Sequence, residues 1–192
     1  MTQAPATPAY QHVVVGMSIL LGLTVTSLLK GAAQIYRNRS RVRPYWLHSA
    51  WVAFLLVFAL FVWWTYWNYR SVTDWDFFRF VLYLSPTITY FFLVTLVLPE
   101  PSDAVSNLRE YYYSQRAGFF GAFAAYGALA GATSVVVRGL SPLDPTHLFR
   151  LAMILLAVVA MRSTNERVHA GVLMIYASFT IVFVALFQLR LG

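Results

Sequence analysis

Long apolar runs separated by short polar segments fill the sequence from Val13 to Leu191. A helix needs about 20 apolar residues to cross a bilayer, and most of these runs approach or reach that length. The short alternating segments of a transmembrane β-barrel are not seen. We therefore predict an all-α integral membrane protein with a single transmembrane domain over residues 1–192. Its six helices form one bundle, at about residues 13–36, 45–67, 76–98, 117–137, 145–161 and 168–189.

The longest polar segment follows the third run and begins with Pro99 and Pro101, which end that helix because proline cannot continue it. Apolar residues then recur at helical spacing on one face, with charged and polar residues elsewhere. We predict a short amphipathic helix near residues 102–114 on the cytoplasmic membrane surface. Its apolar face contains Ala104, Val105, Leu108, Tyr111 and Tyr112.

The composition supports a surface that faces lipid. Charged residues make up 11% of the chain and hydrophobic residues 59%, whereas soluble domains carry about 25% charged residues. The net charge of +7 comes mostly from arginine, whose planar fork binds phosphate groups. We therefore expect anionic lipids as partners and no nucleic acid. The residues expected at the lipid headgroups are Arg37, Arg39, Arg41 and Arg43.

Arginine is distributed unequally between the two sides of the predicted bundle. Eight arginines fall in the first, third and fifth loops, and five fall on the other side. The positive-inside rule places the richer side in the cytoplasm. We expect a bacterial inner-membrane protein with both termini outside the cytoplasm.

Aromatic residues at the ends of the second helix predict interfacial belts, because indole and phenol rings prefer the headgroup region. One belt contains Tyr45, Trp46 and Trp51, and the other contains Trp63, Trp64, Tyr66 and Trp67.

Two polar patterns inside apolar helices are candidates for a substrate path. Polar residues of the first helix share one face, and such a face turns inward in lipid. The third helix contains a central proline, which frees a carbonyl near Leu82, and transporters place binding sites at such breaks. Snorkelling of Lys30 and a simple packing kink at Pro86 are the alternatives. The candidate path residues are Thr24, Ser27, Lys30, Gln34, Ser85, Pro86, Thr87 and Thr89.

The fourth and fifth helices carry further signals. Gly121, Gly127 and Gly131 on the fourth allow close approach of another backbone, which predicts helix packing or an oligomer interface.

The fifth helix begins at Asp144-Pro145, an N-cap followed by a favoured first residue. Arg150 lies close to this start, and Arg79 on the third helix lies at a similar depth. We expect both arginines to pair with Asp76 and Asp144.

Four histidines lie near helix ends, two on each side: His12, His48, His147 and His169. This is the number that two transmembrane haem groups would need, although interfacial histidines with ordinary hydrogen bonds explain the pattern as well. We expect no cofactor. The sequence contains no cysteine and no HExxH, Walker or GxSxG pattern, so enzyme chemistry is not indicated.

The function that these patterns favour is passive passage through a small oligomeric channel or facilitator. The excess of cations near the membrane borders favours anions as the permeant. A non-transporting membrane subunit that binds lipid or a protein partner is the alternative, and a transmembrane haem b protein is the third.

Overall fold

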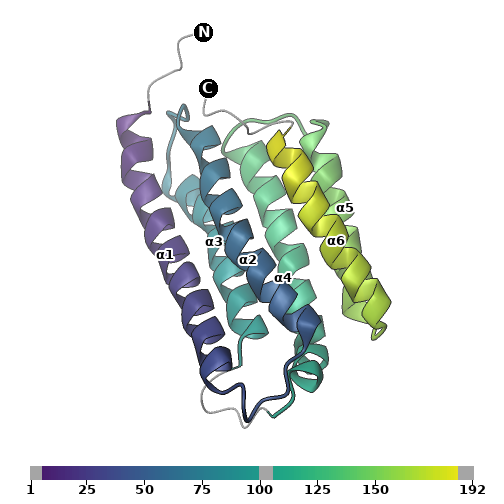
Figure 1. The fold of residues 1–192 in the computed structure, drawn as a ribbon. Coiled ribbons are helices and arrows are strands. Elements are labelled where there is room, and N and C mark those ends of the chain that lie inside the picture. The colour runs from purple at the N-terminus through teal and green to yellow at the C-terminus, as the bar shows by residue number, and fades with distance from the viewer. Residues whose placement is uncertain (1–5, 100–105, 186–192) are drawn as a thin grey trace.

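The computed structural model describes residues 6–99 and 106–185, which form a bundle of six α-helices and one short 3-10 helix (Figure 1). Successive helices run antiparallel, so the start of α1 and the end of α6 lie at the same end of the bundle. The elements are α1 (Pro8–Arg37), α2 (Trp46–Thr65), η1 (Tyr66–Tyr69), α3 (Phe77–Val97), α4 (Leu108–Val136), α5 (Thr146–Arg162) and α6 (Glu166–Phe183).

Five helical segments are long and apolar enough to cross a membrane: α1, α2 with η1, α3, α4 and α6. Their outward faces carry large apolar side chains, such as Ile19, Leu60, Phe92 and Ile181, which are more than half exposed. Apolar exposure on this scale matches a lipid environment. The chain is therefore a helical membrane protein, and its described residues contain no β-strand beyond a single bridge between Arg43 and Asn107.

Polar side chains begin several helices by accepting backbone N–H groups that have no partner within the helix. Asp76 accepts from the Arg79 N–H at 2.8 Å, Asn107 from Arg109 at 3.0 Å, and Asn165 from Arg167 at 2.9 Å. Helices α3, α4 and α6 thus each start directly after a capping residue.

Helix α4 begins earlier than the sequence pattern suggested. The predicted separate surface helix is wrong over residues 108–114, because these residues form the first turns of α4; residues 102–105 lie outside the described part of the chain. Leu108 and Tyr112 are buried, and the Tyr112 ring lies 5.7 Å from that of Tyr45, before α2. The apolar face predicted for the surface helix therefore packs against other residues of the bundle, as part of α4.

The centre of the bundle is an aromatic cluster around Trp51 of α2. The Trp51 side chain is 0% exposed, and edge-to-face contacts join it to Phe119 (5.3 Å), Phe120 (5.4 Å) and Tyr176 (5.7 Å). Its predicted place in an interfacial belt is therefore wrong, since rings from α4 and α6 cover it. Trp46 and Trp63 are 56% exposed, as expected for belt residues.

Candidate functional site

A cavity of about 380 Å³ lies between α2, α4, α5 and α6. We call it the bundle cavity. It lies towards the end of the molecule that carries the α4–α5 loop, and we call this end the cavity end. The opposite end, with the loop from Arg37 to Arg43, is the arginine-rich end. The volume is typical of small-molecule sites. The lining residues are Phe58, Phe61, Thr65, Tyr66, Asn68, Tyr69, Pro86, Phe123, Tyr126, Gly127, Ala130, Ser134, Arg138, Leu140, Asp144, Pro145, Thr146, Phe149, Arg150, Met153, Phe179, Thr180 and Phe183.

Arg150 is the central polar residue of the cavity wall. Its Nη2 donates a hydrogen bond to Ser134 Oγ at 2.9 Å, and its Nη1 donates to Thr146 Oγ1 and His147 Nδ1, both at 3.2 Å. None of these three partners is a carboxylate. Within the described residues, no carboxylate lies within the 4 Å of an ion pair. Arg150 is therefore a fixed cation that makes no ion-pair contact with the described residues.

Arg138 and Asp144 are the other charged residues of the lining. The Arg138 guanidinium lies over the Tyr69 ring at 5.6 Å. The Asp144 carboxylate accepts from the Thr146 hydroxyl at 2.6 Å and from the Thr146 N–H at 2.9 Å. These bonds hold the pKa of the Asp144 carboxyl below its ordinary value. Asp144 is thus hydrogen-bonded to the start of α5. With two arginines and one aspartate in its lining, the cavity has one net positive charge.

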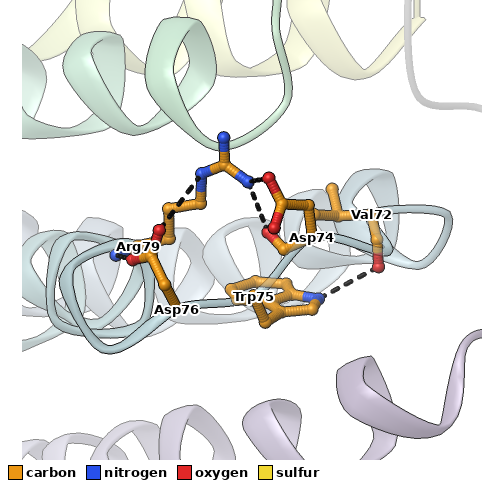
Figure 2. Close-up of polar contacts among 5 residues, drawn as sticks. All are labelled: Val72, Asp74, Trp75, Asp76 and Arg79. Carbon is orange, nitrogen blue, oxygen red and sulfur yellow. Dashed lines mark hydrogen bonds and ion pairs between the residues drawn. The ribbon is translucent and has the colours of Figure 1, made fainter.

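The expected arginine–aspartate pairing is confirmed for one arginine only. Arg79 pairs with Asp74 and Asp76 in the segment that leads into α3 (Figure 2). Arg150 and Asp144 both use Thr146 instead of each other. A cation predicted to be neutralised is therefore available to a ligand.

Aromatic rings make up most of the apolar wall. Phe149 of α5 contacts the rings of Phe179 and Phe183 of α6 at 5.7 and 6.0 Å. On the other side, Tyr126 of α4 lies 5.6 Å from the ring of Phe58 of α2. The cavity therefore combines an apolar body with a cationic group at its side.

The cavity is closed towards the arginine-rich end. Phe123 lines the cavity, and its ring also contacts Tyr176 at 4.6 Å and Trp51 at 6.0 Å. Trp51 and Tyr176 are fully buried. At the cavity end the lining includes the exposed residue Pro145, so the cavity reaches the surface on that side.

The polar stripe of α1 lies apart from the cavity. Thr24 is buried, but its hydroxyl donates to the Leu20 carbonyl of its own helix at 2.8 Å. Ser27 bonds to Leu23 in the same way at 3.0 Å. Lys30 is exposed and Gln34 is partly exposed. The structure does not bring these four residues together with a cavity.

The segment around Pro86 lies at the edge of the cavity, inside a helix that runs without interruption from Phe77 to Val97. Of the four predicted residues, only Pro86 belongs to the lining. Thr87 shares a hydrogen bond of 2.7 Å with Tyr66, and Thr89 donates to the Ser85 carbonyl at 2.9 Å. The structure therefore places one of the eight predicted path residues at the cavity.

The Leu82 carbonyl, which the missing N–H of Pro86 leaves without its helical hydrogen bond, lies close to two side-chain hydroxyls. Ser85 Oγ donates to Leu82 O at 2.8 Å. Thr133 Oγ1 of α4 lies 3.0 Å from the same oxygen and 2.7 Å from Leu129 O of its own helix, so its single proton is shared between these two acceptors. Proline removes the N–H that would otherwise bond there. The segment of α3 around Pro86 is thus hydrogen-bonded to α4 beside the cavity.

We expect Thr133→Val to lower the free energy of unfolding by about 1 kcal/mol, the value of a typical hydrogen bond. In a Pro86→Ala background the loss should be smaller, because the new N–H of residue 86 can bond to Leu82 O. A double-mutant cycle by denaturant titration in detergent measures this coupling. Equal losses in both backgrounds would show that the two residues do not share the carbonyl.

The three predicted packing glycines of α4 face α5. A Cβ on Gly127 would lie 2.9 Å from Ile154 Cγ1, and one on Gly131 would lie 3.8 Å from Arg150 Cδ. Gly121 faces the Met161 sulfur at 3.8 Å by the same construction. These three glycines therefore face another helix of the same chain.

The histidines occupy separate places. His169 bonds through both ring nitrogens, to the Tyr112 hydroxyl at 2.8 Å and the Ser163 carbonyl at 3.0 Å. His48 is buried and bonds to the Val97 carbonyl at 2.7 Å. His147 contacts Arg150, and His12 is exposed. With both nitrogens in use, His169 has none left to bind iron. The described residues contain no group of three metal-ligating side chains.

Sequence reasoning missed Ser134, Tyr126 and the phenylalanine wall. The lining residues that it did name, some for other roles, are Tyr66, Pro86, Gly127, Asp144, Pro145 and Arg150. No family model, no curated protein and no solved structure matches the chain. The site is therefore interpreted from its own geometry.

Proposed function

We propose that this protein is a membrane facilitator that moves a small anion across the bilayer, with the bundle cavity as its substrate site. The observation that supports this most is Arg150, a guanidinium held by Ser134, Thr146 and His147 with no carboxylate partner in the described residues. A cation in an apolar cavity is costly unless an anion accompanies it. The anionic substrate would supply that partner.

In this proposal all six helices span the membrane. Helix α5 has 17 residues, about 25 Å at 1.5 Å per residue, which is short for the roughly 30 Å hydrocarbon core. Arg150 and Arg162 near its ends would then lie close to the two membrane borders. The arginine-rich end faces the cytoplasm of a bacterial inner membrane, the cavity faces outside, and several protomers assemble into an oligomer.

The flux assay uses the full chain in proteoliposomes, with uptake of a set of labelled organic and inorganic anions. We expect wild-type uptake above empty liposomes and its loss in Arg150→Gln. Arg162→Gln is the matched control, because this exposed arginine lies at the far end of the same helix. Lys30→Ala should also leave uptake unchanged. Loss of uptake in Lys30→Ala with normal uptake in Arg150→Gln would move the path to α1 and overturn the assignment.

A non-transporting subunit that binds a ligand without passage is the second candidate. The observation that favours it is the buried aromatic cluster of Trp51, Phe123 and Tyr176, which closes the cavity towards the arginine-rich end. Saturable binding of an anion to a protein that carries none across liposomes would select this candidate.

The orientation gives a separate prediction. The chain has no cysteine, so single cysteines can be introduced without a background. We expect a membrane-impermeant maleimide to label Ser141→Cys on intact cells, because this exposed residue lies in the α4–α5 loop. Ser40→Cys, exposed in the α1–α2 loop, should react only after lysis. The reverse pattern would invert the proposed orientation.

A further inference from the structure

The charge of the bundle cavity limits the charge of its ligand. Its lining contains two arginines and one aspartate, so one positive charge remains. The aspartate is held by Thr146, at the start of α5. A monoanion would leave the cavity neutral, whereas a dianion would leave it with one net negative charge.

The donors of Arg150 limit the shape of the anionic group. A guanidinium has five N–H donors, and Ser134, Thr146 and His147 occupy three of them. Within the described residues, the Nε–H and one N–H of Nη2 remain without an acceptor. Two donors on one planar group suit the two oxygens of a carboxylate.

The remaining wall limits the body of the ligand. Nine of the lining residues are phenylalanine or tyrosine. They come from η1 and from four different helices, α2, α4, α5 and α6, so rings surround the cavity from several sides. Aromatic rings favour edge-to-face and offset contacts with another ring, which adds to the gain from burial. A saturated body of equal size would gain burial alone.

From these three limits we infer that the ligand of the bundle cavity is an aromatic monocarboxylate. Its carboxylate accepts hydrogen bonds from Arg150, and its ring lies among Phe58, Tyr126 and Phe149. This inference rests on the proposed function in taking the cavity as the substrate site. It adds the chemical class of the ligand, which the proposed function leaves open.

The test measures binding to the full chain in phosphatidylcholine nanodiscs by isothermal titration calorimetry. Benzoate is the probe, and four compounds each change one property: benzamide has no charge, acetate has no ring, phthalate has two charges, and cyclohexanecarboxylate has a saturated ring. We expect saturable benzoate binding and at least tenfold weaker binding of benzamide, acetate and phthalate. Cyclohexanecarboxylate should bind several-fold more weakly than benzoate.

Variants of the lining residues Arg150 and Phe149 test whether benzoate binds in the bundle cavity. Arg150→Gln should weaken benzoate binding at least tenfold, and Arg162→Gln should leave it unchanged. Phe149→Leu keeps an apolar side chain, so the protein should fold normally. It should reduce the preference for benzoate over cyclohexanecarboxylate. Benzoate binding that survives Arg150→Gln, or that is matched by benzamide, would overturn the inference.

A lipid phosphate could offer the same monoanionic charge, so the titration is repeated in nanodiscs that contain phosphatidylglycerol. Unchanged benzoate affinity supports the free carboxylate, and competitive loss of binding would assign the cavity to lipid. The flux assay separates the two proposals. Binding of benzoate without uptake would refute the facilitator and keep the ligand class, and uptake of inorganic anions without benzoate binding would do the opposite.

Discussion

Replacing Trp51 with alanine is expected to lower the free energy of unfolding by about 3–5 kcal/mol, the range for large-to-small changes of buried aromatic residues. Trp51 is fully buried and contacts rings of α4 and α6. The space left by its indole cannot be filled by those rigid neighbours without moving the helices that carry them. Denaturant titration of the detergent-solubilised protein measures the loss.

Two variants make this prediction specific. Trp63→Ala removes a tryptophan from the same helix that is 56% exposed, so its cost should be about 0.5 kcal/mol or less. Trp51→Phe keeps a ring in the cluster and should lose much less than alanine. Similar losses for Trp51→Ala and Trp63→Ala would show that the cluster does not hold the bundle together.

Trp51→Ala also tests the proposed transport function. The Trp51 cluster separates the bundle cavity from the arginine-rich end, so a smaller side chain thins this barrier. If the cluster is the closed part of a path, Trp51→Ala that remains folded should raise anion uptake into proteoliposomes. Unchanged uptake in a folded variant would place the barrier elsewhere.

The helices could be predicted from the sequence because the lipid-facing surface is encoded within each segment. Runs such as Leu151 to Met161 need no partner to be recognised as apolar. The start of α4 could not be found in this way. Its first turns mix Arg109 and Glu110 with Leu108 and Tyr112, and this amphipathic pattern fits a membrane surface as well as a helix bundle.

The cavity was largely beyond prediction because it forms where helices distant in sequence meet. The sequence identified Asp144 as the N-cap of the fifth helix and Arg150 as a cation close to that start, but the periodicity of α4 does not say that Ser134 faces Arg150. The α1 stripe, which does not line the cavity, has a different physical explanation. Thr24 and Ser27 satisfy their hydroxyls on carbonyls four residues earlier, so their polarity requires neither water nor a ligand.

Replacing Gly127 with leucine is expected to lower the free energy of unfolding by about 1–3 kcal/mol, as overpacking of a close contact does. A Cβ at this position would lie 2.9 Å from Ile154 Cγ1 and 4.0 Å from the Arg150 carbonyl oxygen. The matched control is Gly22→Leu, because a Cβ there meets nothing within 4 Å. Thermal unfolding in detergent should separate the two variants clearly.

The same contact sets the position of Arg150, which gives Gly127→Leu a second effect. Ser134 and Gly127 lie on α4, and Arg150 lies on α5. The hydrogen bond of 2.9 Å between Ser134 and Arg150 therefore requires the two helices to stay close. A leucine that pushes them apart should break this bond and weaken benzoate binding. Loss of stability with unchanged binding would show that Arg150 is positioned by α5 alone, through Thr146 and His147.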